Sequence, residues 1–162
     1  MKKILCMLLA ILMLTLCFTA CQKNNYSDDK TTAEIGKAIS EKLVGNQTYT
    51  QVDGGALDDY FQTPDYVSEK SIYFSDEGNN IDEFGVFHVE DGQANKMADL
   101  LEKYLTDSYD QNATWYDSYI PEETPKLRDA EVKILGNYVL YAILSEENKS
   151  TAWNAAEELL AK

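Results

Sequence analysis

The first 21 residues constrain this chain most strongly, because they contain all three of its cysteines and its longest apolar run. Two lysines follow Met1, residues 4–18 are apolar, and small residues precede Cys21. The apolar run is shorter than the roughly 20 residues that a membrane-spanning helix needs. This pattern is typical of a bacterial lipoprotein signal peptide. The folded part must then form without disulfides, because Cys6 and Cys17 leave with the peptide and lipidation consumes the Cys21 thiol.

We predict a signal peptide over residues 1–20, cleavage before Cys21 and lipidation of Cys21. The thiol would carry a diacylglycerol group, and the new amino terminus an acyl chain such as palmitate. Two or more chains are enough for stable residence on the extracytoplasmic face of the cell membrane. Phe18 stands where lipoprotein signals usually have Leu. An ordinary secretory peptide cleaved near Ala20 and an uncleaved N-terminal anchor are therefore the alternatives.

Charge limits the partners of the mature chain. The sequence has 28 acidic and 14 basic residues, and cleavage removes two of the lysines, which moves the net charge from −14 to about −16. Nucleic acid and anionic lipid surfaces both require basic patches, so neither is an expected partner. The expected partners are the membrane, through the diacylglycerol lipid, and a protein of the cell envelope.

Polarity and periodicity divide the mature chain into a tether and one domain. Residues 22–30 are polar and show no apolar period, so we predict a lipidated cysteine and flexible tether over 21–30. Residues 31–162 are long enough for one hydrophobic core. Thr31 and Glu34 form a capping-box pattern, which predicts a helix that ends before Gly45.

Two hairpins and two further helices follow along the chain. Strands are predicted over 71–74 and 84–89, and again over 132–135 and 138–144 around the Gly136-Asn137 turn signal. Helical apolar spacing follows Asp91, a plausible N-cap, and follows Ser150. The order strand, strand, helix thus occurs twice. It predicts a two-layer α+β fold in which an antiparallel sheet of about four strands, from two hairpins, packs with three helices.

Several segments together resemble a known family. The chain combines the lipoprotein signal with the strand over 83–90, the Tyr119-Ile120-Pro121-Glu122-Glu123 segment, and Gly136-Asn137-Tyr138-Val139. Over roughly residues 30–160 it is similar to the clostridial lipoproteins grouped as domain of unknown function 4358. The resemblance implies a Gram-positive cell surface. It assigns no activity and no site residue.

Motifs for catalysis and for cofactors are missing from the sequence. His88 is the only histidine, so a pair of histidines cannot bind a metal, and we predict no metal site and no cofactor. His88 lies in mid-strand and shares the face of Phe84 and Val86, which favours a structural role. The acidic segment 76–83 offers oxygen ligands for Ca²⁺ but lacks the spacing of an EF-hand, and a solvated hairpin loop is the simpler interpretation.

Aromatic residues at 104–119 alternate with aspartates. Such a segment can stack on sugar rings or surround a cation, although packing of the helix against the sheet is the simpler explanation. We name Trp115, Tyr116 and Tyr119 as candidate ligand-binding residues. The first functional hypothesis is a non-enzymatic binding or interaction module. The alternatives are a receptor for a glycan or a cationic solute and, further off, a hydrolase that uses two carboxylates.

Overall fold

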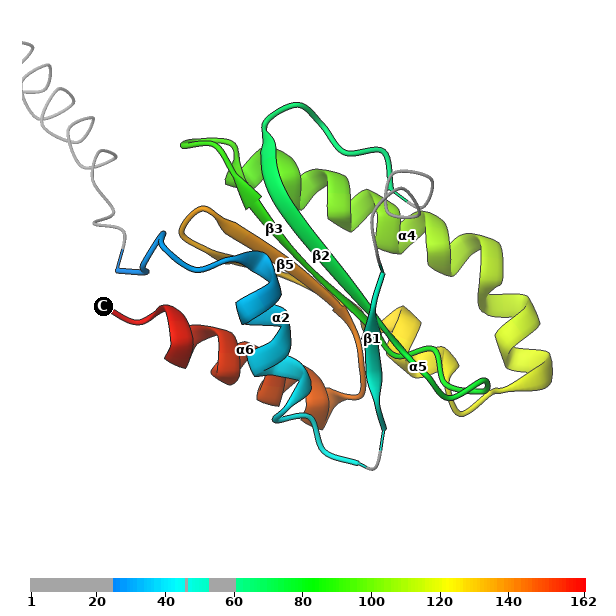
Figure 1. The fold of residues 1–162 in the computed structure, drawn as a ribbon. Coiled ribbons are helices and arrows are strands. Elements are labelled where there is room, and N and C mark those ends of the chain that lie inside the picture. The colour runs from blue at the N-terminus through cyan, green and yellow to red at the C-terminus, as the bar shows by residue number, and fades with distance from the viewer. Residues whose placement is uncertain (1–24, 46, 53–60) are drawn as a thin grey trace, which may run out of the picture.

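The computed structural model describes residues 25–45, 47–52 and 61–162. These residues form a five-stranded antiparallel sheet with helices packed on it (Figure 1). The predicted signal peptide and Cys21 lie outside the described residues. The strand order is β1-β2-β3-β5-β4. The strands are β1 (Tyr49–Gln51), β2 (Val67–Ser75), β3 (Glu83–Val89), β4 (Glu131–Leu135) and β5 (Tyr138–Ile143).

The two central strands carry apolar side chains on both faces. Every residue of β5 is buried, and His88 is the only residue of β3 that is not. Alternate residues point to opposite sides of a sheet, so the sheet contributes to two separate cores. One core contains Phe84, Val86 and Leu140, and the other contains Phe87, Val139 and Tyr141.

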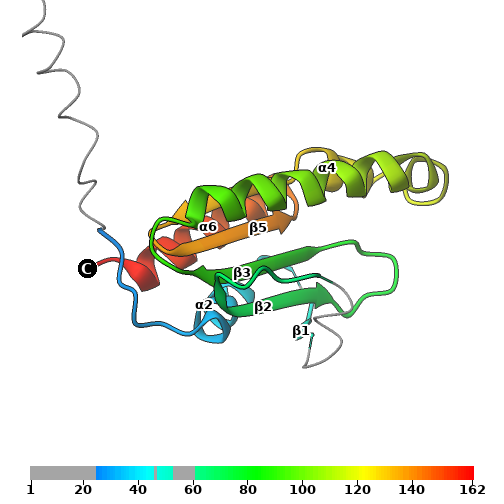
Figure 2. The same cartoon turned by 90° about the horizontal axis from the view of Figure 1, so that it is seen from above.

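Helices therefore cover both faces, and the two-layer prediction is wrong. The helices α2 (Thr32–Ser40) and α6 (Glu146–Leu160) pack against one another over the first core. On the opposite face α4 (Ala94–Tyr119) covers the second core, together with the short α5 (Thr124–Arg128). Figure 2 shows α2 and α4 on opposite sides of the sheet. Two apolar faces require two covering layers, and the described residues form four helices rather than three.

The α+β class and the antiparallel pairing of the strands are confirmed, but the two hairpin-helix units are not repeats. The β2–β3 hairpin leads into α4 on one face, whereas β4–β5 leads into α6 on the other. The two units thus have opposite hands. The Gly136-Asn137 turn is confirmed, and Gly136 has a φ of 68°, the left-handed region that this turn requires.

The observed helix ends differ from the predicted ones, and local residues explain where the helices begin and end. The capping box of Thr31 and Glu34 is present, but α2 already ends at Ser40. The cap of α6 is Ser145, five residues before the predicted start. The helix α4 continues to Tyr119, just before Pro121, which cannot continue a helix. No helix in the described ranges has both the length and the apolar character needed to cross a membrane.

The segment 25–30, predicted to belong to the flexible tether, lies against the domain. The Ser27 amide donates to the Leu160 carbonyl at 2.7 Å, and Tyr26 forms a β-bridge with Ala161. Asp28 contacts His88 Nε2 at 2.9 Å, and Ser68 Oγ lies 2.6 Å from His88 Nδ1. His88 therefore helps to hold the N-terminal segment against the end of β3.

Candidate functional site

A groove lies between the loop that joins β2 to β3 and the C-terminal end of α4. Its cavity measures about 350 Å³, within the range of small-molecule sites. The loop supplies one wall and the last turns of α4 supply the other. The lining residues are Phe74, Ser75, Gly78, Asn79, Asn80, Ile81, Asp82, Glu83, Trp115, Tyr116 and Ile120.

Aromatic side chains form the α4 wall of the groove. Trp115 is 54% exposed although it is a large apolar residue, and Tyr119 is 69% exposed. The two rings stack with centroids 4.9 Å apart, and Tyr116 meets Trp115 edge to face at 5.3 Å. The structure thus brings all three predicted aromatic residues into one cluster at the surface. Trp115 and Tyr116 line the groove, while Tyr119 supports Trp115 from outside it.

A buried carboxylate, that of Glu83, belongs to a residue in the lining of this groove. Glu83 is only 7% exposed, and its Oε1 accepts hydrogen bonds from the Tyr104 hydroxyl at 2.9 Å and from the Tyr141 hydroxyl. Glu83 also lines a second, smaller cavity of about 130 Å³. Ile81 and Tyr116 line both cavities as well, so the two spaces adjoin at Glu83. The smaller cavity is otherwise lined by Tyr104, Ser108, Asn112, Leu127 and Ile143.

Tyr116 connects the aromatic wall to this carboxylate. Burial, followed by the negative charge of Glu83, raises the pKa of Tyr116 above its ordinary value. The phenol therefore keeps its proton at neutral pH and remains available as a hydrogen-bond donor. The groove thus combines aromatic ring surface, a neutral hydroxyl donor and a buried carboxyl group that accepts hydrogen bonds.

Ionic contacts hold the loop that forms the opposite wall. Lys126 of α5 lies with its Nζ 2.7 Å from Asp82 Oδ1 and 2.8 Å from Glu123 Oε2. The Tyr49 hydroxyl donates to Asp82 Oδ2, and Glu123 accepts from the Ile81 amide. Burial by itself would lower the pKa of Lys126, but hydrogen bonds to Asp82 and Glu123 outweigh it and raise the pKa. These contacts hold the loop against α5, so this wall of the groove has a fixed position.

The acidic segment considered for Ca²⁺ contributes to this wall. Among the residues that the structure describes, no group of three or more histidine, cysteine, aspartate or glutamate side chains could hold a metal ion. The Asp82 carboxylate instead binds Lys126 and Tyr49, as described above. The loop therefore lines the groove with Asn79 and Asn80, and Glu83 follows at the start of β3.

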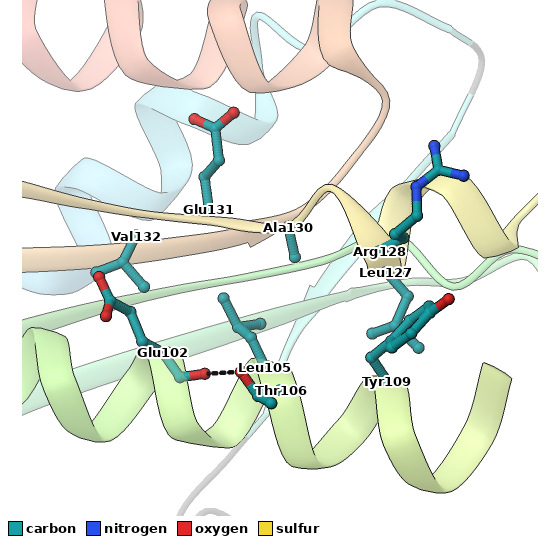
Figure 3. Close-up of a pocket in the computed structure, with 9 residues that line it drawn as sticks. All are labelled: Glu102, Leu105, Thr106, Tyr109, Leu127, Arg128, Ala130, Glu131 and Val132. Atoms are coloured by element: carbon teal, nitrogen blue, oxygen red, sulfur yellow. Dashed lines mark hydrogen bonds between the residues drawn. The ribbon is translucent and has the colours of Figure 1, made fainter.

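A larger cavity of about 570 Å³ lies between α4, α5 and the edge strand β4 (Figure 3). Its polar groups do not converge. Figure 3 shows the side chains of Glu131 and Arg128 pointing away from the space above α4. Glu131 binds Lys149 of α6 at 2.9 Å, and Arg128 binds Asp129. A ligand site needs a few polar groups that face a common point, so the groove at Trp115 is the better candidate.

An α+β domain with one antiparallel sheet covered on both faces is thus the class of protein that the fold defines. A family model described as Domain of unknown function (DUF4358) matches residues 42–144. This range holds all five strands, α4 and α5, so it includes both walls of the groove, while α2 and α6 lie outside it. The chain therefore belongs to the DUF4358 family. No curated protein and no solved structure matches the chain.

Proposed function

We propose that this protein is an extracytoplasmic lipoprotein that acts as a non-enzymatic binding module, with the groove beside Trp115 as its ligand site. One observation carries the proposal of a site: the exposed ring of Trp115 and the half-buried Tyr116 line a cavity whose lining also includes the buried Glu83. Large apolar side chains at a protein surface are common at binding sites, where a ligand covers them. These groups suit a small ligand, either a glycan or a cationic solute.

Binding is a better explanation of the site than hydrolysis. Hydrolysis of a glycoside by two carboxyl groups requires both to face one bond from opposite sides. Of the two acidic residues that the structure describes in the lining, Asp82 is bound by Lys126 and by the Tyr49 hydroxyl. Glu83 alone projects toward α4, where Tyr104 contacts it. The remaining groups of the groove are aromatic rings, amides and hydroxyls, which recognise a ligand.

The placement of the groove suits a receptor anchored at its N-terminus. The segment 25–30 contacts the C-terminal end of β3 at His88, whereas Glu83 lies at the other end of that strand, roughly 17 Å away. Figures 1 and 2 show the N-terminal segment and the 76–82 loop at opposite ends of the molecule. Asn25 follows Cys21 by only four residues, a span of at most roughly 14 Å. A lipid on Cys21 would thus hold the domain close to the membrane with the groove directed outward.

A ligand screen with the Trp115→Ala variant tests the binding function. We expect one class among sugars, amino acids, polyamines and Ca²⁺ to raise the melting temperature of the full chain in mild detergent. A ligand at 100 times its Kd stabilises a fold by about 2.7 kcal/mol, which shifts the melting temperature by several degrees. Trp115→Ala should lose most of this shift. Val44→Ala removes an exposed apolar side chain in another part of the molecule and should keep it. A shift that Trp115→Ala leaves intact would place the site elsewhere.

Replacement of Cys21 by Ser tests the lipid anchor. The variant lacks the thiol that would carry the diacylglycerol group, so we expect it to move from the membrane fraction to the soluble fraction. Cys6→Ser is the matched control, because this residue would be removed with the signal peptide, and its product should stay in the membrane fraction. Cell fractionation followed by immunoblotting measures both. Retention of a correctly cleaved Cys21→Ser chain in the membrane would contradict the lipoprotein proposal.

A further inference from the structure

We propose that the groove binds an organic cation, whose ammonium group enters the small inner cavity beside Glu83 while its hydrocarbon part lies along Trp115 and Tyr116. This inference rests on the proposed function and specifies its ligand class. A polyamine or a basic side chain has the chemistry in question.

The charged residues described in the lining are acidic. Among the residues that the structure describes, those that line the two cavities include Asp82 and Glu83 but no lysine, arginine or histidine. Lys126 binds Asp82, Glu123 and Asn80. Of the two lining carboxylates, that of Glu83 belongs to both cavities, whereas that of Asp82 belongs to the outer groove. A buried carboxylate in a site of low dielectric attracts a cation more strongly than an exposed carboxylate does.

The aromatic wall suits a cation as well. The faces of Trp and Tyr rings carry negative charge density and attract ammonium groups, most strongly where water is excluded. Trp115 and Tyr116 line the outer groove together with Glu83, and Tyr116 and Glu83 also line the smaller cavity. The chain as a whole has a net charge of −14, which raises the concentration of cations near the surface and repels anions. The local groups and the overall field thus favour the same class of ligand.

The size of the inner cavity favours a narrow head group. The inner space measures about 130 Å³ and the outer groove about 350 Å³. Sites for drug-sized ligands begin at about 300 Å³, so only the outer groove has room for the body of a ligand. The inner space has room for an ammonium group, and Glu83, Tyr116, Ser108 and Asn112 are among the residues that line it. An inorganic cation is a poorer fit because no group of three or more ligating side chains is present in the described residues.

Isothermal titration calorimetry of the full chain in mild detergent, at 150 mM NaCl, tests this inference with spermidine as the probe. We expect saturable binding, weakened roughly 10- to 100-fold by Glu83→Gln, because hydrogen bonds to a charged group contribute about 1.5–3 kcal/mol. Glu90→Gln is the matched control: it removes the same charge just beyond the other end of β3, from an exposed side chain. Glu90→Gln should leave the affinity unchanged. Trp115→Ala, at an exposed position, should weaken binding about threefold or more without unfolding the domain.

The remaining outcomes separate the possible failures. Equal weakening by Glu83→Gln and Glu90→Gln would mean general attraction to an acidic surface, and it would overturn the inference. Titration of the same proteins with N-acetylglucosamine distinguishes the ligand classes. Binding of the neutral sugar but not of spermidine, lost in Trp115→Ala, would overturn the cation inference and leave the binding function standing. If neither probe binds and the wider ligand screen also shows no effect of Trp115, both proposals fail.

Discussion

Replacing Lys126 by Met should lower the free energy of unfolding by about 3–5 kcal/mol, because it leaves two buried carboxylates without their cation. The Asp82 side chain is 1% exposed and that of Glu123 is 12% exposed. Neither can regain much hydration when the ammonium group is lost. Methionine retains the apolar stem, so the experiment isolates the charge. Urea unfolding followed by circular dichroism measures the change.

A second substitution gives a further check on the same contact. Without Lys126, the Asp82 carboxylate is a buried charge with no cation to balance it, and replacing it by a neutral amide removes that charge. The double variant Asp82→Asn with Lys126→Met should recover part of the lost stability.

Lys103→Met is the control for the loss of one positive charge. Lys103 pairs with Asp107 on the exposed surface of α4, where their side chains are 72% and 48% exposed. Exposed pairs of this kind contribute less than about 1 kcal/mol. Equal losses from Lys103→Met and Lys126→Met would show that the buried cluster does not hold the loop against α5.

A methyl group added at Gly85 should cost about 1–3 kcal/mol and lower the melting temperature by roughly 4–12 °C. Gly85 lies in the centre of β3, opposite Tyr141 of β5. A Cβ atom there would lie 2.3 Å from Tyr141 Cε1 and 3.0 Å from Cδ1. The ring has little room to move away, because Tyr104 packs on it edge to face at 5.6 Å and its hydroxyl donates to Glu83.

Gly78→Ala is the matched control for this substitution. Gly78 lies in the loop between β2 and β3, and a Cβ atom there would have no neighbour within 4 Å. We expect its melting temperature to stay within a degree or two of the original. Differential scanning calorimetry compares the two variants. A Gly85→Ala protein as stable as Gly78→Ala would mean that the Tyr141 ring does not pack against this strand. Because Tyr141 also contacts Glu83, Gly85→Ala should disturb the inner cavity as well.

Elements with strong local signals were predicted correctly. The capping box at Thr31, the apolar run of β3 and the Gly136-Asn137 turn each depend on neighbouring residues, and all three are present in the structure. The elements without such signals were missed. The strand β1 has three residues and α5 has five, so neither is long enough for a periodic pattern. Both depend on contacts with distant parts of the chain.

The candidate site, too, was predicted only where neighbouring residues gave a signal. The aromatic composition around Trp115 and Tyr116 indicated a ligand surface, and the structure places both residues in the wall of a groove. Glu83 was not singled out, since its acidic neighbours made it one choice among 28 acids. Its position at the start of an apolar strand was the one available signal. Only the docking of α4, which brings Tyr104 against β3, buries this carboxylate and makes it part of a cavity.

The sequence by itself determined the features that depend on near neighbours: the leader pattern that ends at Cys21, the acidic charge, the α+β class and the hairpin turn. The tertiary structure decided that helices cover both faces of the sheet, and it decided where the groove forms. The apolar residues of β3 and β5 alternate between two faces, but their spacing does not say which helix covers which face. The packing of α4 and α6 on opposite sides settles this. Packing energies depend on distant contacts, which local patterns do not encode.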